Sequence, residues 1–437
     1  MKWNVKNIFW INDSLENRIS YCHLLCFLLM LPFDRFYSEI ILISFVAHVI
    51  IHLDRQKIRR AVNFKTLLLA SPFLINVVGL IYSADKTQGF KDMERQLSIL
   101  LFPFLIAASG LEISRYRNGL LKAFSLICVS TVVYLFLYNV RLLLYNHLPI
   151  SYLFSTLFTN HKFSAPIGMH ATYLSMYVST SMICLLFFCL HEENKKKRTL
   201  YYAGIFILLA GLLQLASRNV SIATAFIVTV LYPLFIESRS VRIKFRATTV
   251  AITACAAVTI LGIDGLRHRY TSELKNEVSQ PTSSEILEPR IERWQVAWTL
   301  VKEAPLTGYG SGSEKRILMD QYFEQKLYGA YLHKLNAHNE YLSIMLKTGL
   351  WGLVIFLFTL AYGLATAWVN RDAVFASFVT LIIFICFSEN ILDVNKTIFF
   401  YSFFFSVLLY SCKHSIVIQG TRKLRAIKTN QAKEIVA

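Results

Sequence analysis

The chain has 437 residues, of which 55% are hydrophobic and only 16% are charged, and its mean hydropathy is +0.47. Soluble domains carry about 25% charged residues, so this composition excludes a set of ordinary soluble domains and predicts an integral membrane protein. The formal charge of +18 would also suit a nucleic-acid-binding protein, but that depends on where the charge lies.

Twelve apolar runs follow one another along the chain, and a helix needs roughly 20 such residues to cross a bilayer. The runs are residues 17–33, 38–53, 65–83, 97–111, 119–140, 165–190, 199–216, 219–236, 247–264, 341–368, 373–390 and 397–412. They predict an all-α polytopic membrane protein with about 12 transmembrane helices. The predicted divisions are 1–264 (helices 1–9), 265–340 (a long, partly helical outer loop with a flexible stretch at 276–289), 341–412 (helices 10–12) and 413–437 (a basic tail).

The positive charges are distributed unequally between the two sides of these predicted helices. The side that holds both termini carries 26 Lys and Arg, and the short loops of the opposite side carry 8. Those eight are Arg35, Lys86, Lys91, Arg95, Arg141, Lys162, Arg218 and Lys396. Lys and Arg accumulate on the cytoplasmic side of membrane proteins, so both termini are expected in the cytoplasm and no nucleic-acid partner is expected.

The eight cysteines do not suggest a disulfide framework or a metal site. All lie in or at the edge of apolar runs, and none belongs to a Cys-x-x-Cys pair. Disulfide-rich and zinc-binding proteins show paired cysteines at short spacings in polar segments. We therefore expect small buried thiols and no bound metal.

A cation at the start of a predicted helix in the outer loop is the first candidate for function. The segment 289–303 has apolar residues at helical spacing, namely Ile291, Trp294, Trp298 and Val301. At 100° per residue Arg290 falls on the face of Trp294, and the helix dipole disfavours a cation at an N-terminus. Arg290 is therefore either functional or a first-turn arginine that extends to water.

Arg218 is a second unusual cation, because it forms part of the only break between the runs 199–216 and 219–236. A guanidinium group matches the geometry of phosphate oxygens, so it indicates an anionic partner near the bilayer surface. The alternative is an interfacial arginine with no ligand.

The third candidate is His338, where the outer loop meets the next apolar run. His338 and Asn339 fall at the cap of that helix, and Gly349 and Gly352 are expected to break or thin it. Histidine exchanges protons near neutral pH, which suits a general base, although a cap or surface role is the alternative. The glycine-rich stretch 308–312 lacks the ending of a phosphate loop and predicts a turn that approaches a neighbouring segment closely.

Together these elements resemble the O-antigen ligase superfamily. The resemblance covers roughly residues 215–355. It consists of Ser217-Arg218, Arg290-xxx-Trp294, Pro305-Leu306-Thr307-Gly308-Tyr309-Gly310, and His338-Asn339 followed after nine residues by Gly349-xx-Gly352.

The resemblance implies a glycosyltransferase of the bacterial inner membrane with its active site facing the periplasm. The implied donor is a glycan on undecaprenyl diphosphate, and the implied acceptor is a sugar hydroxyl of the lipid A core. His338 would be the general base, and Arg218 and Arg290 would hold the diphosphate. The transfer would invert the anomeric centre without a metal or other cofactor. Further candidates for substrate contact are Asn339, Arg293, Arg95 and Tyr309.

Each further candidate also has a simpler interpretation: Arg95 could only extend to water, Arg293 could pair with Glu292 or Glu288, and Tyr309 could pack in the core. At the level of function, glycan-repeat polymerases and ligases that glycosylate proteins share the same motif. Polymerases often carry an Arg-x10-Gly pattern. In this chain the position of that glycine is occupied by Val301 after Arg290 and by Thr229 after Arg218, so the pattern is absent. A non-enzymatic lipid-linked glycan transporter is the last alternative.

Overall fold

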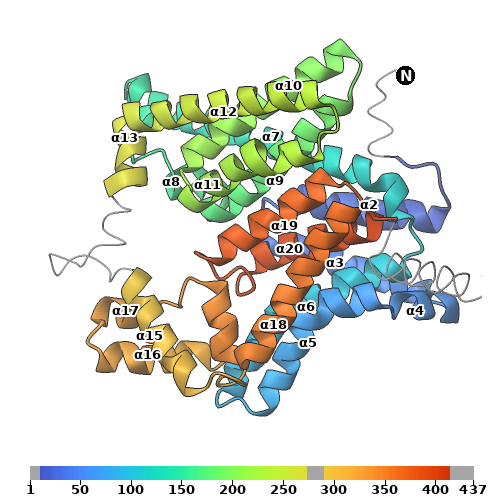
Figure 1. Cartoon of the computed structure of the whole chain (residues 1–437), viewed down its shortest axis with the longest axis vertical. Helices are drawn as coiled ribbons and strands as arrows, with labels where there is room; N and C mark the ends of the chain where they lie inside the picture. The colour runs from blue at the N-terminus through green and yellow to red at the C-terminus, as the bar shows by residue number, and fades with distance from the viewer. Residues whose placement is uncertain (1–9, 273–289, 414–437) are drawn as a thin grey trace, which may run out of the picture.

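The computed structural model describes residues 10–272 and 290–413, and in these residues it contains helices and no strand (Figure 1). This confirms the predicted all-α class. The predicted flexible stretch 276–289 and all but the first residue of the basic tail 413–437 lie outside the described residues.

The first half of the described chain contains α2 (Leu15–Met30), α3 (Arg35–Ile51), α4 (Arg55–Ala61), α5 (Phe64–Ile81), α6 (Lys86–Ala108), α7 (Ile113–Tyr145), η1 (Ile150–Phe154), α8 (His161–Ser164), η2 (Ala165–Ile167), α9 (Ala171–His191) and α10 (Lys195–Leu215). The second half contains α11 (Arg218–Phe226), η3 (Ile227–Leu231), η4 (Tyr232–Phe235), α12 (Arg239–Gly262), α13 (Asp264–Arg267), η5 (His268–Ser272), α15 (Arg290–Glu303), α16 (Glu314–Glu324), α17 (Tyr328–Leu332), α18 (Glu340–Val369), α19 (Ala373–Cys386) and α20 (Asn395–Ser411).

Every predicted apolar run overlaps one helix or consecutive helical segments, although the ends of the runs and of the helices differ. Seven of these are long and apolar enough to cross a membrane: α5, α7, α9, α10, the segments 218–235, α12 and α18. The other five runs correspond to α2, α3, α6, α19 and α20. The chain thus has the helices of a membrane protein, and the count of twelve crossings stays a prediction.

The helices differ widely in how deeply they lie within the molecule. In the apolar window of α9, 83% of residues are buried, whereas in that of α12 only 6% are. Around α9 a single apolar core joins α2, α6, α7, α19 and α20. Rings of Phe27, Phe102 and Phe403 pack there with centroid separations of 4.7 to 5.5 Å. All eight cysteines are free thiols, but the expectation that they are buried is wrong for Cys22 and Cys255, which are exposed.

The helices α15, α16 and α17 form the outer segment and lie together at one end of the molecule, beside α5 and α18 (Figure 1). They share a small apolar core with the start of α18: Val296, Ala297, Leu300, Val301, Leu318, Tyr322, Ala330, Ala337, Met345 and Leu346. The predicted apolar stripe of α15 was partly wrong, because Ile291 and Trp298 are exposed. The buried face is displaced toward Arg293 and Val296, since α15 packs on both α16 and α18.

The predicted break in α18 is confirmed at Gly349, whose φ of 65° and ψ of −159° are not helical. The loop that connects α15 to α16 supplies hydrogen bonds at this break. The Tyr309 amide donates to the Leu346 carbonyl at 2.8 Å, and the Leu350 amide donates to the Pro305 carbonyl at 2.8 Å. Backbone groups released by the break are thereby satisfied, as buried amides and carbonyls must be.

The same loop contacts the turn between α5 and α6 on its other side. The Ser311 amide donates to the Gly79 carbonyl at 3.2 Å, and its hydroxyl donates to the Asn76 carbonyl at 2.7 Å. Gly310 has a φ of 91° and lies against the backbone of Ser83. Only glycine tolerates such a conformation and such an approach, which confirms the predicted close passage of the backbone.

Candidate active site

His338 lies in a tight loop directly before α18. Its φ of 47° is in the left-handed region, which costs a residue with a side chain about 1–2 kcal/mol. The His338 amide donates to the side-chain oxygen of Asn336 at 3.1 Å. Such conformations persist only where the surroundings enforce them, and they are concentrated at functional sites.

Helix α15 holds this loop in place. The guanidinium of Arg293 donates to the Asn336 carbonyl at 3.4 Å, and the indole N–H of Trp294 donates to the Ala337 carbonyl at 2.9 Å. Arg293 is buried, with 5% of its surface exposed. These contacts favour a positioning role for Arg293. Its contact with glycan stays a prediction, and Glu288, one of its two predicted partners, lies outside the described residues.

The structure brings His338 and Arg290 together through a carboxylate that the sequence did not suggest. Nδ1 of His338 lies 3.7 Å from Oε2 of Glu389, and the Arg290 guanidinium lies 4.0 Å from Oε1 of the same residue. Arg290 also donates to the Ser388 carbonyl at 3.3 Å. Glu389 belongs to the loop 387–394 between α19 and α20, and only 6% of its side chain is exposed.

Glu389 stays ionised in this environment. Burial by itself would raise the pKa of its carboxyl, but the interactions with His338, Arg290 and His170 outweigh burial and lower the pKa below its ordinary value. The loop therefore presents a fixed negative charge to the imidazole and the guanidinium.

Arg218 is the first residue of α11, and the start of this helix is attached to the same loop. The side-chain amide of Asn219 donates to the Phe384 carbonyl at 2.6 Å and to the Ser388 hydroxyl at 2.7 Å. The carbonyl of Ser388 also accepts from Arg290. Asn219, the residue after Arg218, and Arg290 therefore bind the same residue of the loop. The charge of Arg218 also acts on Tyr270, whose pKa is raised by burial and partly lowered again by this charge.

Two histidines missed in the sequence complete the surroundings of Glu389. The rings of His161 and His170 are edge to face, with centroids 4.1 Å apart. Burial lowers the pKa of His170 to about 4; the charge of Glu389 opposes this, and those of His338 and Arg290 add to it. His170 was missed because the predicted run 165–190 placed it inside a membrane helix. In the structure α9 begins at Ala171, and His170 lies in the loop before it.

The other predicted site residues have contacts within the protein, and their contact with substrate stays a prediction. Asn339 caps α18, since its side-chain oxygen accepts from the Leu342 amide at 3.1 Å. The Tyr309 hydroxyl donates to the Leu300 carbonyl at 3.1 Å inside the outer segment. Arg95 lies on α6, 3.3 Å from Asp92.

Comparison with known proteins identifies the part of the chain that carries these motifs. Residues 175–357 match the family described as O-antigen ligase. This region of the chain is similar to the O-antigen ligase family. The family covers O-antigen ligases and polymerases, and its members are glycosyltransferase-like enzymes. The resemblance inferred from the sequence is thereby confirmed.

A curated protein of Haemophilus influenzae is also similar to this chain. It is 22% identical over 310 residues, which cover 65% of this chain and 76% of that protein. It is described only as an uncharacterized protein, so the similarity adds no information on function. Within the present chain, Arg218, Arg290 and His338 lie inside the matched region, whereas Glu389 and His170 lie outside it.

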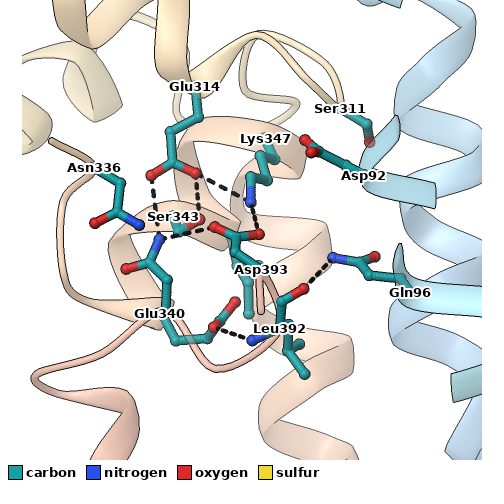
Figure 2. A network of polar contacts seen from close by, with 12 residues as sticks. Asp92, Gln96, Ser311, Glu314, Asn336, Glu340, Ser343, Lys347, Leu392 and Asp393 are labelled. Atoms are coloured by element: carbon teal, nitrogen blue, oxygen red, sulfur yellow. Dashed lines mark hydrogen bonds and ion pairs between the residues drawn. The ribbon is translucent and has the colours of Figure 1, made fainter. Parts of the chain in front are cut away.

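A buried ionic network joins α16, α18 and the loop 387–394 (Figure 2). The Lys347 ammonium lies 3.1 Å from a carboxylate oxygen of Glu314 and 2.5 Å from one of Asp393. Lys347 belongs to α18 and Glu314 to α16, so this network ties the outer segment to the helix bundle. Removing one partner would leave a buried charge unpaired, which is strongly destabilising.

The network also fixes the loop that carries Glu389. The Asn339 amide donates to the Asn390 side chain at 2.8 Å, and the Leu392 amide donates to the Glu340 carboxylate at 2.8 Å. Gln96 of α6 donates to the Leu392 carbonyl at 2.8 Å (Figure 2). The loops of His338 and Glu389 are therefore held to each other and to the bundle.

The arrangement offers a base, one guanidinium group and a fixed carboxylate in one place, and Arg218 begins a helix that is attached to the same loop. His338 is 30% exposed and Arg290 is 26% exposed, so both can reach a ligand while Glu389 stays buried. Among residues 10–272 and 290–413, no three His, Cys, Asp or Glu side chains converge as a metal ion would require. The site is suited to hold an anion and to accept a proton beside it.

Proposed function

We propose that this protein is an O-antigen ligase, which transfers a glycan from undecaprenyl diphosphate to a sugar hydroxyl of the lipid A core. The observation that carries the proposal is the convergence of His338 and Arg290 on Glu389. The attachment of the Arg218 helix to the same loop supports it. A transfer from a lipid diphosphate needs a base for the acceptor and cations for the leaving group, and these residues supply both.

In the proposed reaction, the acceptor hydroxyl attacks the anomeric carbon while the bond from that carbon to the diphosphate breaks. The hydroxyl proton passes to Nε2 of His338 and from there to water. Nδ1 faces Glu389 at 3.7 Å, so a proton on Nδ1 would point at the carboxylate and leave Nε2 free to accept. Catalytic hydrogen bonds are often long before substrate binds and shorten in the complex.

Arg218 and Arg290 would hold the diphosphate and stabilise the charge that develops as it leaves. A diphosphate is already a competent leaving group, and the proposed reaction is therefore metal-independent and uses no cofactor. Attack on the face opposite the diphosphate would invert the anomeric centre.

The proposal places the protein in the bacterial inner membrane, with both termini in the cytoplasm and the site facing the periplasm. The distribution of Lys and Arg in the sequence supports this orientation. A donor with a membrane-bound tail then reaches cations that lie at the ends of apolar helices, near the lipid headgroups.

The test uses the purified full-length protein with undecaprenyl-diphosphate glycan and lipid A core, in EDTA. Wild type is compared with His338→Ala and with His333→Ala, a matched control at an exposed histidine five residues earlier. Wild type and His333→Ala should form the product, and His338→Ala should lose at least about 10²-fold in rate, as general bases contribute 10²–10⁴-fold. Equal rates for all three proteins would refute the mechanism.

The same assay distinguishes the alternative functions. If wild type lengthens the carrier-linked glycan and leaves the core lipid unmodified, the protein is a repeat polymerase. Glycan on a protein Ser or Thr would indicate a protein O-oligosaccharyltransferase. Movement of the intact donor across vesicle membranes, without any new bond, would indicate a transporter.

A further inference from the structure

A cavity lies between α3, α6 and α20, outside the matched region 175–357. Its volume is about 680 Å³, which is within the usual range of ligand sites. Its charged lining residues are Arg35, Glu39, Lys91, Glu94 and Arg95. Its apolar lining residues are Leu42, Ile43, Val46, Leu97, Leu101 and Phe399.

The charged and apolar residues of this cavity are segregated along its length. Arg35 is the first residue of α3, and Lys91 and Arg95 precede Leu101 on α6. From Lys91 to Leu101 the helix rises about 15 Å at 1.5 Å per residue. This is half of the roughly 30 Å hydrocarbon core of a bilayer, so the cavity has the depth of one leaflet, with its charges at one end.

This cavity holds a large share of the few cations on the predicted outer side of the protein. Of the eight Lys and Arg in the predicted outer short loops, three line this one cavity. Within residues 10–272 and 290–413, Lys91 forms no ion pair and is exposed. The side chain of Arg95 is 41% exposed beside Asp92, and the Glu39 carboxylate accepts from Asn395 at 3.0 Å. An anion can therefore approach Lys91 and Arg95 without first displacing a salt bridge of Lys91.

We propose that this cavity binds the lipid end of the acceptor, an outer-leaflet saccharide lipid that carries phosphates and several acyl chains. Arg35, Lys91 and Arg95 bind its phosphates, and the apolar lining receives acyl chain. The inference rests on the proposed ligase function for the identity of this lipid. The charge pattern of the cavity supports an anionic amphiphile independently of that function.

The position of the cavity relative to His338 suits such an acceptor. Asn395, at the edge of the cavity, follows Glu389 by six residues, and Gln96, next to Arg95, donates to the Leu392 carbonyl. The loop 387–394 therefore connects Glu389 of the proposed active site to α20, whose residues Asn395 and Phe399 line the cavity. An acceptor that reacts at the far end of an oligosaccharide must bind its lipid at a distance from the base.

The first experiment measures KM values for donor and acceptor with the purified full-length protein. Lys91→Glu and Arg95→Glu are compared with Lys86→Glu, the same charge reversal at an exposed position of α6 that does not line the cavity. We expect the acceptor KM to rise about tenfold or more in the first two variants, with donor KM within about twofold of wild type. With a delipidated core oligosaccharide as acceptor, the difference between variants and wild type should disappear.

The second experiment measures binding without any transfer. Fluorescently labelled lipid A is titrated with each protein in the absence of donor, and its anisotropy is followed. We expect wild type and Lys86→Glu to bind equally and Lys91→Glu to bind at least about tenfold more weakly. If wild type fails to transfer glycan but shows this charge-dependent binding, the proposed function is wrong and the cavity assignment stands.

Three results would overturn the assignment. Equal weakening by Lys86→Glu would attribute the effect to general surface charge. Competition by phosphatidylglycerol as effective as that by unlabelled lipid A would indicate a site for any anionic lipid. An acceptor KM unchanged in both Lys91→Glu and Arg95→Glu, with normal folding, would exclude the cavity as the acceptor site.

Discussion

Replacing Glu389 by glutamine should change how the proposed activity depends on pH. The substitution keeps the shape of the side chain but removes the negative charge that lies 3.7 Å from Nδ1 of His338. Because the pKa of Glu389 is lowered, its charge is present at neutral pH and is lost only as the pH falls through that lowered pKa. This charge stabilises the imidazolium that forms as His338 takes the acceptor proton, so the glutamine variant should be slower at neutral pH and should lack the loss of activity that wild type shows as Glu389 becomes protonated.

The size of the loss follows from the distance. At about 4 Å and an effective dielectric constant of about 20, two unit charges interact by about 4 kcal/mol, which is an upper bound because His338 is 30% exposed and solvent reduces the interaction. A loss of about 1.4 kcal/mol of transition-state stabilisation lowers a rate tenfold, so we expect kcat to fall about tenfold or more.

The assay is glycan transfer by the purified protein between pH 5 and 9, with kcat/KM determined at each pH. Glu324→Gln is the matched control, because Glu324 is an exposed glutamate of α16 in the outer segment. Glu389→Asp keeps the charge and should restore most of the rate. Equal rates of wild type and Glu389→Gln at neutral pH would refute the proposed coupling of Glu389 to His338.

Three further substitutions test the supports of the site. Arg293→Met should lower kcat about tenfold or more through displacement of the His338 loop, with donor KM within about twofold; a raised donor KM at unchanged kcat would instead show that Arg293 contacts the donor. Gly349→Ala should lower the free energy of unfolding by more than about 2 kcal/mol, as seen in the unfolding temperature in detergent. The control Gly262→Ala, which has open space around it, should be neutral or stabilising. Lys347→Met should destabilise by about 3–5 kcal/mol, and adding Glu314→Gln should restore part of this loss; equal stability of the single variant and wild type would show that the buried network contributes nothing.

Hydropathy located all the major helices of the bundle but not their ends. The run 97–111 marks only the apolar part of α6, which begins eleven residues earlier at Lys86. The first turns of this helix are charged, and a scan for apolar residues cannot detect a helix that continues into a polar environment. The run 165–190 erred in the opposite direction, because it included the loop of His170 before α9.

The proposed site was predictable as far as its motif residues extend. Arg290 and His338 could be selected because each is unusual in its local context, but Glu389 acts through contacts with residues about 50 and 100 positions away in the sequence. One signal was available: Glu389 is a carboxylate near the end of the apolar run 373–390, and ionisable residues in such runs are commonly functional. The positioning role of Arg293 depends on the path of the loop before α18, which local spacing does not specify.

The glycine-rich loop between α15 and α16 restricts which segments of this protein can be exchanged with those of a homologous protein. Its backbone is bonded on one side to the interrupted α18 and on the other to the α5–α6 turn, segments more than 200 residues apart in the chain. A chimera that takes residues 290–340 from a homologous protein would therefore bring a loop shaped for a different turn. To alter specificity by such an exchange, residues 76–89 would have to be transplanted together with the outer segment.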